Sequence, residues 1–196
     1  MLQPYDVLYG SKYTMFSTDL DRFILQRMVS WLWLAPPCSS FSPLRNLDRG
    51  GPLRPIGKPE GDEQVPEVKR GNDMWYRALD LCELILTQQG YFVVEHPLNS
   101  KAWQLPRTQY LLSQPGVRLL RIDQCMYHGD EVGTRKPTRL MTNAPWVPIV
   151  CLSCDGRHEH GPMLRGARAA QASAYPWGLC RALAAALRAW LDGLHQ

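Results

Sequence analysis

Two residues of the chain have the chemistry of a covalent catalytic site. Cys38 follows the apolar run 29–34 and the pair Pro36-Pro37, which is typical of a buried strand that ends at a loop. Glu95 directly follows a second apolar run, residues 91–94. A thiolate can form a covalent intermediate, and a neighbouring carboxyl group can stabilise the charge that develops. The alternatives are a small buried cysteine and a solvated or ion-paired carboxylate.

The intervening elements must bring these two residues together. After Asn72, which could cap a helix, apolar residues recur at helical spacing, and Gly90 suits the helix exit before strand 91–94. The order strand, helix, strand predicts a right-handed crossover between parallel neighbours. Cys38 and Glu95 would then lie at the same edge of the sheet, where open α/β sheets bind ligands.

A cysteine- and histidine-rich patch near the C-terminus could hold a metal. It offers two thiols and two imidazoles within ten positions: Cys151, Cys154, His158 and His160. Zn²⁺ takes four such ligands tetrahedrally, so the sequence predicts a structural zinc site. The His-x-His spacing is short, and Cys125 or Cys180 could complete the ligand set. The alternative is a loop of free thiols and solvated histidines.

Two short motifs carry a family resemblance. The stretch Ala35-Pro-Pro-Cys-Ser-Ser-Phe-Ser42 resembles the Pro-Cys motif of the DNA (cytosine-5) methyltransferases, and Phe92-Val-Val-Glu-His-Pro97 resembles their Glu-Asn-Val motif, with His96 and Pro97 replacing Asn and Val. The resemblance implies that Cys38 attacks cytosine carbon 6 and that Glu95 holds ring nitrogen 3. It also implies DNA as partner and S-adenosylmethionine as methyl donor, with the target base flipped into the site.

Weaker similarities extend the resemblance. Lys136-Pro-Thr-Arg-Leu140 is similar to the family's paired strands, which implies that Arg135 or Arg139 contacts the base; two surface arginines of a hairpin are the alternative. Asp19 could match an acidic position that contacts the cofactor's adenine, although a helix N-cap explains it as well. Pro36 and Pro37 are assigned to the cofactor side by the same resemblance.

The sequence also departs from the family. No Gly-rich loop precedes Cys38, and the 37 residues upstream are too few for a complete cofactor-binding half. The family's large target-recognition region is missing as well. We therefore expect a domain truncated at its N-terminus, of a kind that a mobile element or phage could carry.

These observations predict an α/β fold, partly Rossmann-like in the manner of class I methyltransferases, with a mostly parallel sheet flanked by helices. One domain would span residues 1–196, with further strands at 117–122 and 136–142 and a C-terminal helix, 177–194, packed on the sheet. The Pro- and Gly-rich stretch 43–70 predicts a long loop, either a mobile cover of the site or a disordered insertion. Residues 148–174 would form the Cys/His-rich insertion.

Composition limits the function classes. The chain has 196 residues, 45% apolar and 20% charged, with a formal charge of +4, which permits an anionic partner without requiring one. No signal-peptide pattern and no apolar run of the roughly 18 residues that a membrane span needs is present, so we expect a soluble intracellular protein without membrane contact. Its six cysteines would be reduced.

Three functional hypotheses follow. The preferred one is a cytosine-5 methyltransferase-like protein, inactive if nothing replaces the missing Gly-rich loop. The first alternative is a non-catalytic, zinc-stabilised nucleic-acid-binding module. The second is an unrelated thiol enzyme in which His96 activates Cys38. Target sequence, preference for DNA over RNA, and oligomeric state have no signature in the sequence.

Overall fold

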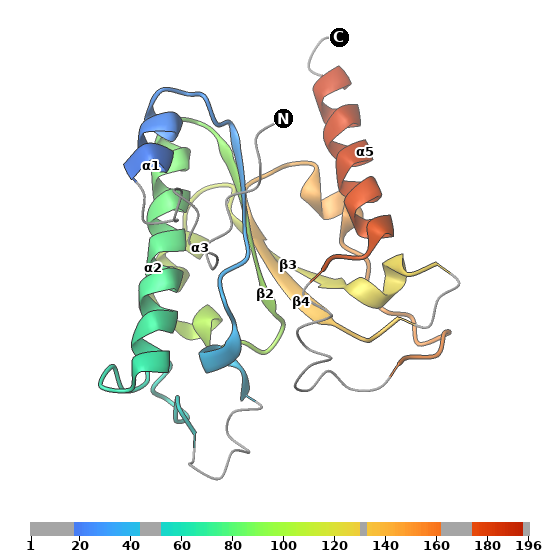
Figure 1. Cartoon of the computed structure of the whole chain (residues 1–196). Helices are drawn as coiled ribbons and strands as arrows, with labels where there is room; N and C mark the ends of the chain where they lie inside the picture. The colour runs from blue at the N-terminus through green and yellow to red at the C-terminus, as the bar shows by residue number, and fades with distance from the viewer. Residues whose placement is uncertain (1–17, 44–51, 130–132, 162–173, 194–196) are drawn as a thin grey trace.

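The fold is a four-stranded sheet with helices on both faces. The computed structural model describes residues 18–43, 52–129, 133–161 and 174–193. Within these ranges the strands form one sheet in the order β1-β2-β4-β3. They are β1 (Trp31–Leu34), β2 (Tyr91–Pro97), β3 (Arg118–Asp123) and β4 (Pro137–Thr142). Helices α1 (Thr18–Leu25) and α2 (Pro66–Thr87) cover one face, and α5 (Trp177–Gly193) covers the other (Figure 1).

Strands β1 and β2 are parallel neighbours, as the sequence predicts. Trp31 pairs with Tyr91 and Leu34 pairs with Val94. Parallel strands need a crossover connection, and α2 supplies it by packing on both β1 and β2. The carboxyl ends of β1 and β2 therefore lie at the same edge of the sheet.

The expectation of a mostly parallel sheet is wrong. Strand β4 lies between β2 and β3 and pairs antiparallel with both, so one of the three strand pairings in the described sheet is parallel. The physical reason is the connection from β3 to β4. In its described part, residues 124–129 and 133–136, this connection holds a single short 3-10 helix, η4 (Gln124–Tyr127), and at 13 residues it is short for the crossover that a parallel pairing requires.

The alternation of side chains along the strands builds two cores. Phe92 and Val94 point towards α1 and α2, and pack with Trp75 and Leu79 of α2. Val93 and its cross-strand neighbours point the other way, towards α5 and the 3-10 helix η5 (Val147–Val150). Successive residues of β2 therefore belong to different faces of the sheet, which decides where Glu95 and His96 point.

Helix α2 begins earlier than expected. Pro66 occupies its first turn, where a missing N–H costs nothing, and the helix runs to Thr87. Asn72 is therefore a buried interior residue of α2, and the predicted loop 43–70 ends at Val65. Residues 44–51 of that loop lie outside the described residues.

The C-terminal part covers the second face. Leu179 and Ala186 of α5 are buried in the core beneath it, as predicted for a helix docked on the sheet. Residues 151–161 follow η5 without helix or strand, and residues 162–173 of the predicted insertion lie outside the described ranges. None of the described helices combines the length and apolar character of a membrane span.

Candidate active site and metal-binding group

Cys38 and Glu95 lie at a common rim of the sheet. Cys38 comes four positions after Leu34, the last residue of β1, and forms the N-cap of the 3-10 helix η1 (Ser39–Phe41). Glu95 lies within β2 rather than after it, but it is one position beyond Val94, the last residue that pairs with β1. The two groups are close enough that the Glu95 carboxylate raises the pKa of the Cys38 thiol.

The surroundings of Cys38 keep its thiol protonated at neutral pH. The side chain is half-buried, and burial is the main cause that raises its pKa above the ordinary value. Glu95 raises that pKa further, whereas Lys136 acts in the opposite direction. A reaction at this thiol therefore depends on the balance between the carboxyl group and the ammonium group beside it.

Glu95 is buried, with 8% of its surface exposed, and it is surrounded by donors. Tyr175 Oη donates to Oε2 at 3.4 Å, and Gln124 Nε2 donates to Oε1 at 3.4 Å. Lys136 Nζ lies 3.8 Å from Oε1. Burial raises the pKa of the carboxyl group, and Lys136, Tyr175 and Thr138 oppose the rise. A buried carboxyl group with a raised pKa is suited to acid–base chemistry.

Tyr175 is itself held in place. Its hydroxyl accepts a hydrogen bond of 3.0 Å from Trp33 Nε1 of β1, and its ring packs edge-on against Trp33 at 5.6 Å between centroids. Burial, followed by the nearby Glu95 carboxylate, raises the pKa of Tyr175, so it stays a donor at physiological pH. Lys136 Nζ lies 5.4 Å from the centre of the same ring.

The two arginines expected at the base do not accompany Glu95. Arg139 pairs with His96 in the β2–β4 register, so strand alternation places it on the α2 face, opposite Glu95. Arg135 is exposed in the segment before β4. The cation beside Glu95 is Lys136, which the sequence contains in the same motif but which the resemblance did not single out.

His96 is sealed in the core between the sheet and α2. It has no exposed surface, and its Nδ1 lies 2.7 Å from Ser100 Oγ. Burial lowers its pKa to about 3, against the opposing effect of the Pro37 and Pro36 carbonyls. A neutral, buried imidazole on the face opposite Glu95 does not support the hypothesis in which His96 activates Cys38.

A buried arginine fixes the loop that carries Cys38. Arg54 is 1% exposed; its guanidinium donates to the Ser40 carbonyl at 3.0 Å and to the Ser40 hydroxyl at 2.9 Å. It also donates to Asn72 Oδ1 of α2 at 2.8 Å and lies 3.6 Å from the centre of the Phe41 ring. These hydrogen bonds tie the described part of the long loop to η1 and α2. This part of the loop is therefore neither the mobile cover nor the disordered insertion that the sequence suggested. Sequence patterns did not indicate this role, because a lone arginine in a polar stretch carries no signal of burial.

A hollow of about 400 Å³ lies between α2 and the loop that carries Cys38, although Cys38 itself is not among its lining residues. Pro37 and Ser39 form one wall, and the first turns of α2, with Arg70 and Gly71, form the other. Of the residues assigned to cofactor binding, Pro37 lines this hollow, whereas Pro36 is buried and does not line it. Asp19 lies in the first turn of α1, where it pairs with Arg22 at 2.9 Å, and is not among the lining residues.

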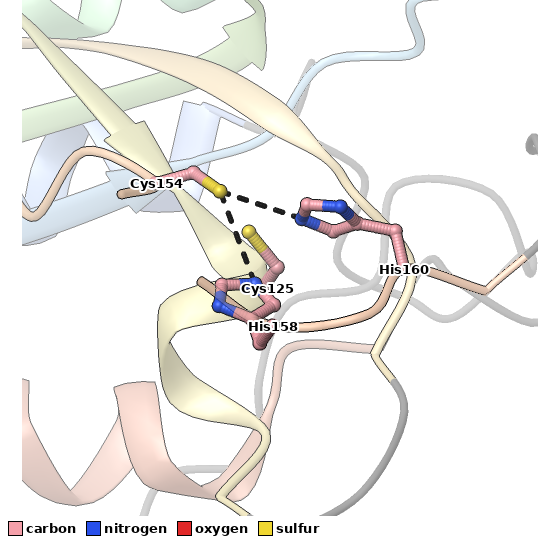
Figure 2. A group of neighbouring side chains, drawn as sticks. All are labelled: Cys125, Cys154, His158 and His160. Carbon is pink, nitrogen blue, oxygen red and sulfur yellow. Dashed lines mark hydrogen bonds between the residues drawn. The ribbon is translucent and has the colours of Figure 1, made fainter. Parts of the chain in front are cut away.

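Four side chains converge into a group that could hold a metal ion. The potential ligand atoms of Cys125, Cys154, His158 and His160 all lie within 4.8 Å of one another (Figure 2). Cys154 Sγ is 3.4 Å from His160 Nε2 and 3.9 Å from His158 Nε2. Two thiols and two imidazoles are a ligand set that Zn²⁺ takes in structural sites.

This group differs from the predicted one by one residue. Cys151 lies outside it, because it ends η5 and its thiol donates to the Val147 carbonyl at 3.4 Å. Cys125, which the sequence offered only as a possible additional ligand, is the second thiol of the group. It belongs to η4, directly after β3. The local Cys-x-x-Cys pair is therefore split, and the second thiol comes from a distant part of the chain.

Comparisons of the chain with protein-family models, with curated proteins and with solved structures find no match. The geometry of the site is therefore the structural basis for assigning a function.

Proposed function

We propose that the rim holding Cys38 and Glu95 is a covalent thiol site that methylates cytosine in DNA. The observation that carries the proposal is the buried carboxyl group of Glu95, whose pKa is raised and which interacts electrostatically with the Cys38 thiol. A nucleophile and an acid on one rim are what addition to a pyrimidine ring requires. The resemblance of the two motifs to the cytosine-5 enzymes supports the same assignment.

Each group has a defined role in the proposed reaction. The Cys38 thiolate adds to carbon 6, and Glu95 stabilises the charge that reaches ring nitrogen 3. S-adenosylmethionine, when bound, would supply the methyl group to carbon 5 and would leave as the neutral thioether. Loss of the proton from carbon 5 and release of the thiolate restore the ring. Lys136 lowers the pKa of Cys38 and so favours its thiolate form.

The hollow lined by Pro37 and Ser39, the chain neighbours of Cys38, is the place we propose for part of the methyl donor. Its volume of about 400 Å³ falls within the range of ligand pockets, which is roughly 300–1,000 Å³. Residues 18–37 contain no glycine, so the family's Gly-rich loop has no counterpart in this described segment. Binding of the donor would depend on the walls from η1 and α2 instead.

Trapping on DNA tests the reaction. The full chain is incubated with S-adenosylmethionine and a duplex containing 5-fluorocytosine, in which fluorine replaces the proton that must leave carbon 5. We expect a covalent adduct that resists denaturation, that is lost in Cys38→Ser, and that persists in Cys151→Ser. If S-adenosylmethionine binds but no adduct is found, the covalent mechanism is wrong. If no adduct is found and S-adenosylmethionine does not bind, the proposal of methyl transfer is wrong.

We also propose that the Cys/His group binds Zn²⁺ as a structural ion. Its S₂N₂ set and the mutual approach of its ligand atoms support this assignment. Residues 151–161 form no helix or strand, so a metal would stabilise a segment with little regular structure of its own. If the thiol site proves inert, zinc binding together with retained DNA affinity would favour the second function, a non-catalytic nucleic-acid-binding module.

A further inference from the structure

We propose that the metal held by Cys125, Cys154, His158 and His160 organises the hydrogen-bond donors around Glu95, and so acts as a positioning ion for the acid site. The inference rests on the proposed zinc binding and on the proposed role of Glu95. Its basis is that η4 contributes neighbouring residues to both groups, Cys125 to the metal group and Gln124 to the donors around Glu95.

The first connection passes through Gln124. This residue directly precedes the ligand Cys125, is 2% exposed, and its side chain points into the Glu95 pocket. Its Nε2 donates to Glu95 Oε1 at 3.4 Å and to Thr138 Oγ1 at 3.2 Å, and its backbone N–H donates to the Lys136 carbonyl at 3.2 Å. An ion bound by Cys125 therefore restrains the backbone that aims Gln124.

The second connection fastens the metal-binding loop to β3. The backbone N–H of Cys154 donates to Asp123 Oδ2 at 2.8 Å, and the N–H of Asp123 donates to the Leu152 carbonyl at 2.8 Å. Asp123 has no exposed surface. Ligands from two distant segments thus meet where those segments are already joined, so metal binding would lock η4 against the loop.

The third connection reaches Tyr175. Helix α5 begins against η4, and a Cβ added at Gly178 would lie 2.4 Å from the Tyr127 carbonyl. Tyr175, three positions before Gly178, donates to Glu95 Oε2 at 3.4 Å. Of the donors to Glu95, Gln124 therefore belongs to η4 itself, and Tyr175 leads into α5, which contacts η4.

Hydrogen–deuterium exchange of the full chain tests this coupling, with zinc bound and after removal of zinc by a chelator. We expect zinc removal to cause loss of protection in 124–128 and 151–161, and also in the Glu95 segment 91–97 and the Tyr175 segment 174–180, while α2 keeps its protection. Loss confined to 151–161 would overturn the inference, since the ion would then be a local clip. Loss throughout the chain, α2 included, would overturn it as well, and so would failure to bind zinc.

A variant isolates the first connection. In the zinc-bound Gln124→Leu variant we expect faster exchange in residues 91–97 and an unchanged zinc content. The control Cys151→Ser should change neither the exchange rate nor the zinc content. Unaltered exchange in 91–97 of Gln124→Leu would show that Gln124 does not couple the metal group to Glu95. These exchange measurements contain no cytosine and no methyl donor. The coupling can therefore be confirmed even if DNA trapping fails, and it can be refuted even if trapping succeeds, so the two proposals are tested separately.

Discussion

Tyr175 donates a hydrogen bond to Glu95 at 3.4 Å across 80 positions of sequence. The contact joins the segment that leads into α5 to the strand that carries the acid. The other groups around this pair come from β1, η4 and the residue before β4, through Trp33, Gln124 and Lys136. The acid site is thus assembled from segments that are distant in the sequence, and its properties are testable one group at a time.

Glu95 and Lys136 should have opposite effects on the reactivity of the Cys38 thiol. Burial is the main cause that raises the pKa of Cys38, with Glu95 next and Lys136 opposing. Glu95→Gln should therefore lower this pKa, and Lys136→Met should raise it. The pH dependence of Cys38 alkylation, followed by mass spectrometry, measures both shifts, with Glu83→Gln on the exposed side of α2 as the control. Shifts of the same sign in the two variants would contradict the assignment.

Glu95 should make stability fall as pH rises. Its native pKa is raised by burial, whereas in the unfolded chain it titrates near about 4.3. Between these two values the native state binds the extra proton, so the free energy of unfolding decreases as pH increases. Urea unfolding from pH 4 upwards should show wild type losing stability relative to Glu95→Gln across this window. A difference that is constant with pH would show that the native carboxyl group titrates normally.

Removing the Arg54 side chain should be among the most damaging single changes. Arg54→Met removes the donor to three buried acceptors, the Ser40 carbonyl, the Ser40 hydroxyl and Asn72 Oδ1, and unpaired buried acceptors cost about 1–3 kcal/mol each. We expect a loss above about 3 kcal/mol in urea unfolding. The control Arg188→Met, whose side chain is 78% exposed, should change stability by less than about 0.5 kcal/mol.

Gly71 should not tolerate alanine although it lies inside a helix. Glycine to alanine in a helix interior normally stabilises by about 1 kcal/mol. At Gly71 the new Cβ would lie 2.3 Å from Ser40 Oγ, so either the Ser40 hydroxyl must rotate and lose its hydrogen bond from Arg54, or α2 and η1 must separate. We expect Gly71→Ala to destabilise by about 1–3 kcal/mol and to increase alkylation of Cys38. At Gly193, where an added Cβ meets nothing within 4 Å, alanine should be harmless.

Cys125 and Cys151 should differ sharply in metal binding. Cys125→Ser removes one of the four converging ligands, whereas Cys151→Ser removes a thiol outside the group. We expect zinc to be lost from Cys125→Ser at chelator concentrations that wild type and Cys151→Ser resist. Metal content after dialysis against graded chelator provides the measurement. Equal retention in both variants would mean that the ion binds elsewhere.

The sequence was sufficient for features that local patterns and one crossover determine. The apolar runs located β1 and β2, and the helix between them made the strands parallel, which placed Cys38 and Glu95 at one rim. The insertion of β4 between β2 and β3 was missed, because strand order depends on pairing between distant segments.

The site was predicted less completely, for a related reason. Periodicity and spacing describe neighbours in sequence, whereas Lys136, Tyr175 and Gln124 reach Glu95 from other elements. The metal group shows the same limit: Cys-x-x-Cys suggested that Cys151 and Cys154 bind together, but the turn at η5 directs Cys151 to the Val147 carbonyl. Burial of Arg54 likewise follows from tertiary contacts that no local pattern encodes.

The place of β4 in the sheet also orders events during synthesis. Residues 93–97 of β2 pair with residues 138–142 of β4. The ribosome must therefore synthesise β4 before this side of β2 can be paired. Tyr175 emerges later still. The nucleophile's strand can meet β2 early, but the acid acquires its full surroundings only after Tyr175 has been synthesised, so the acid site matures later than the pairing of β1 with β2.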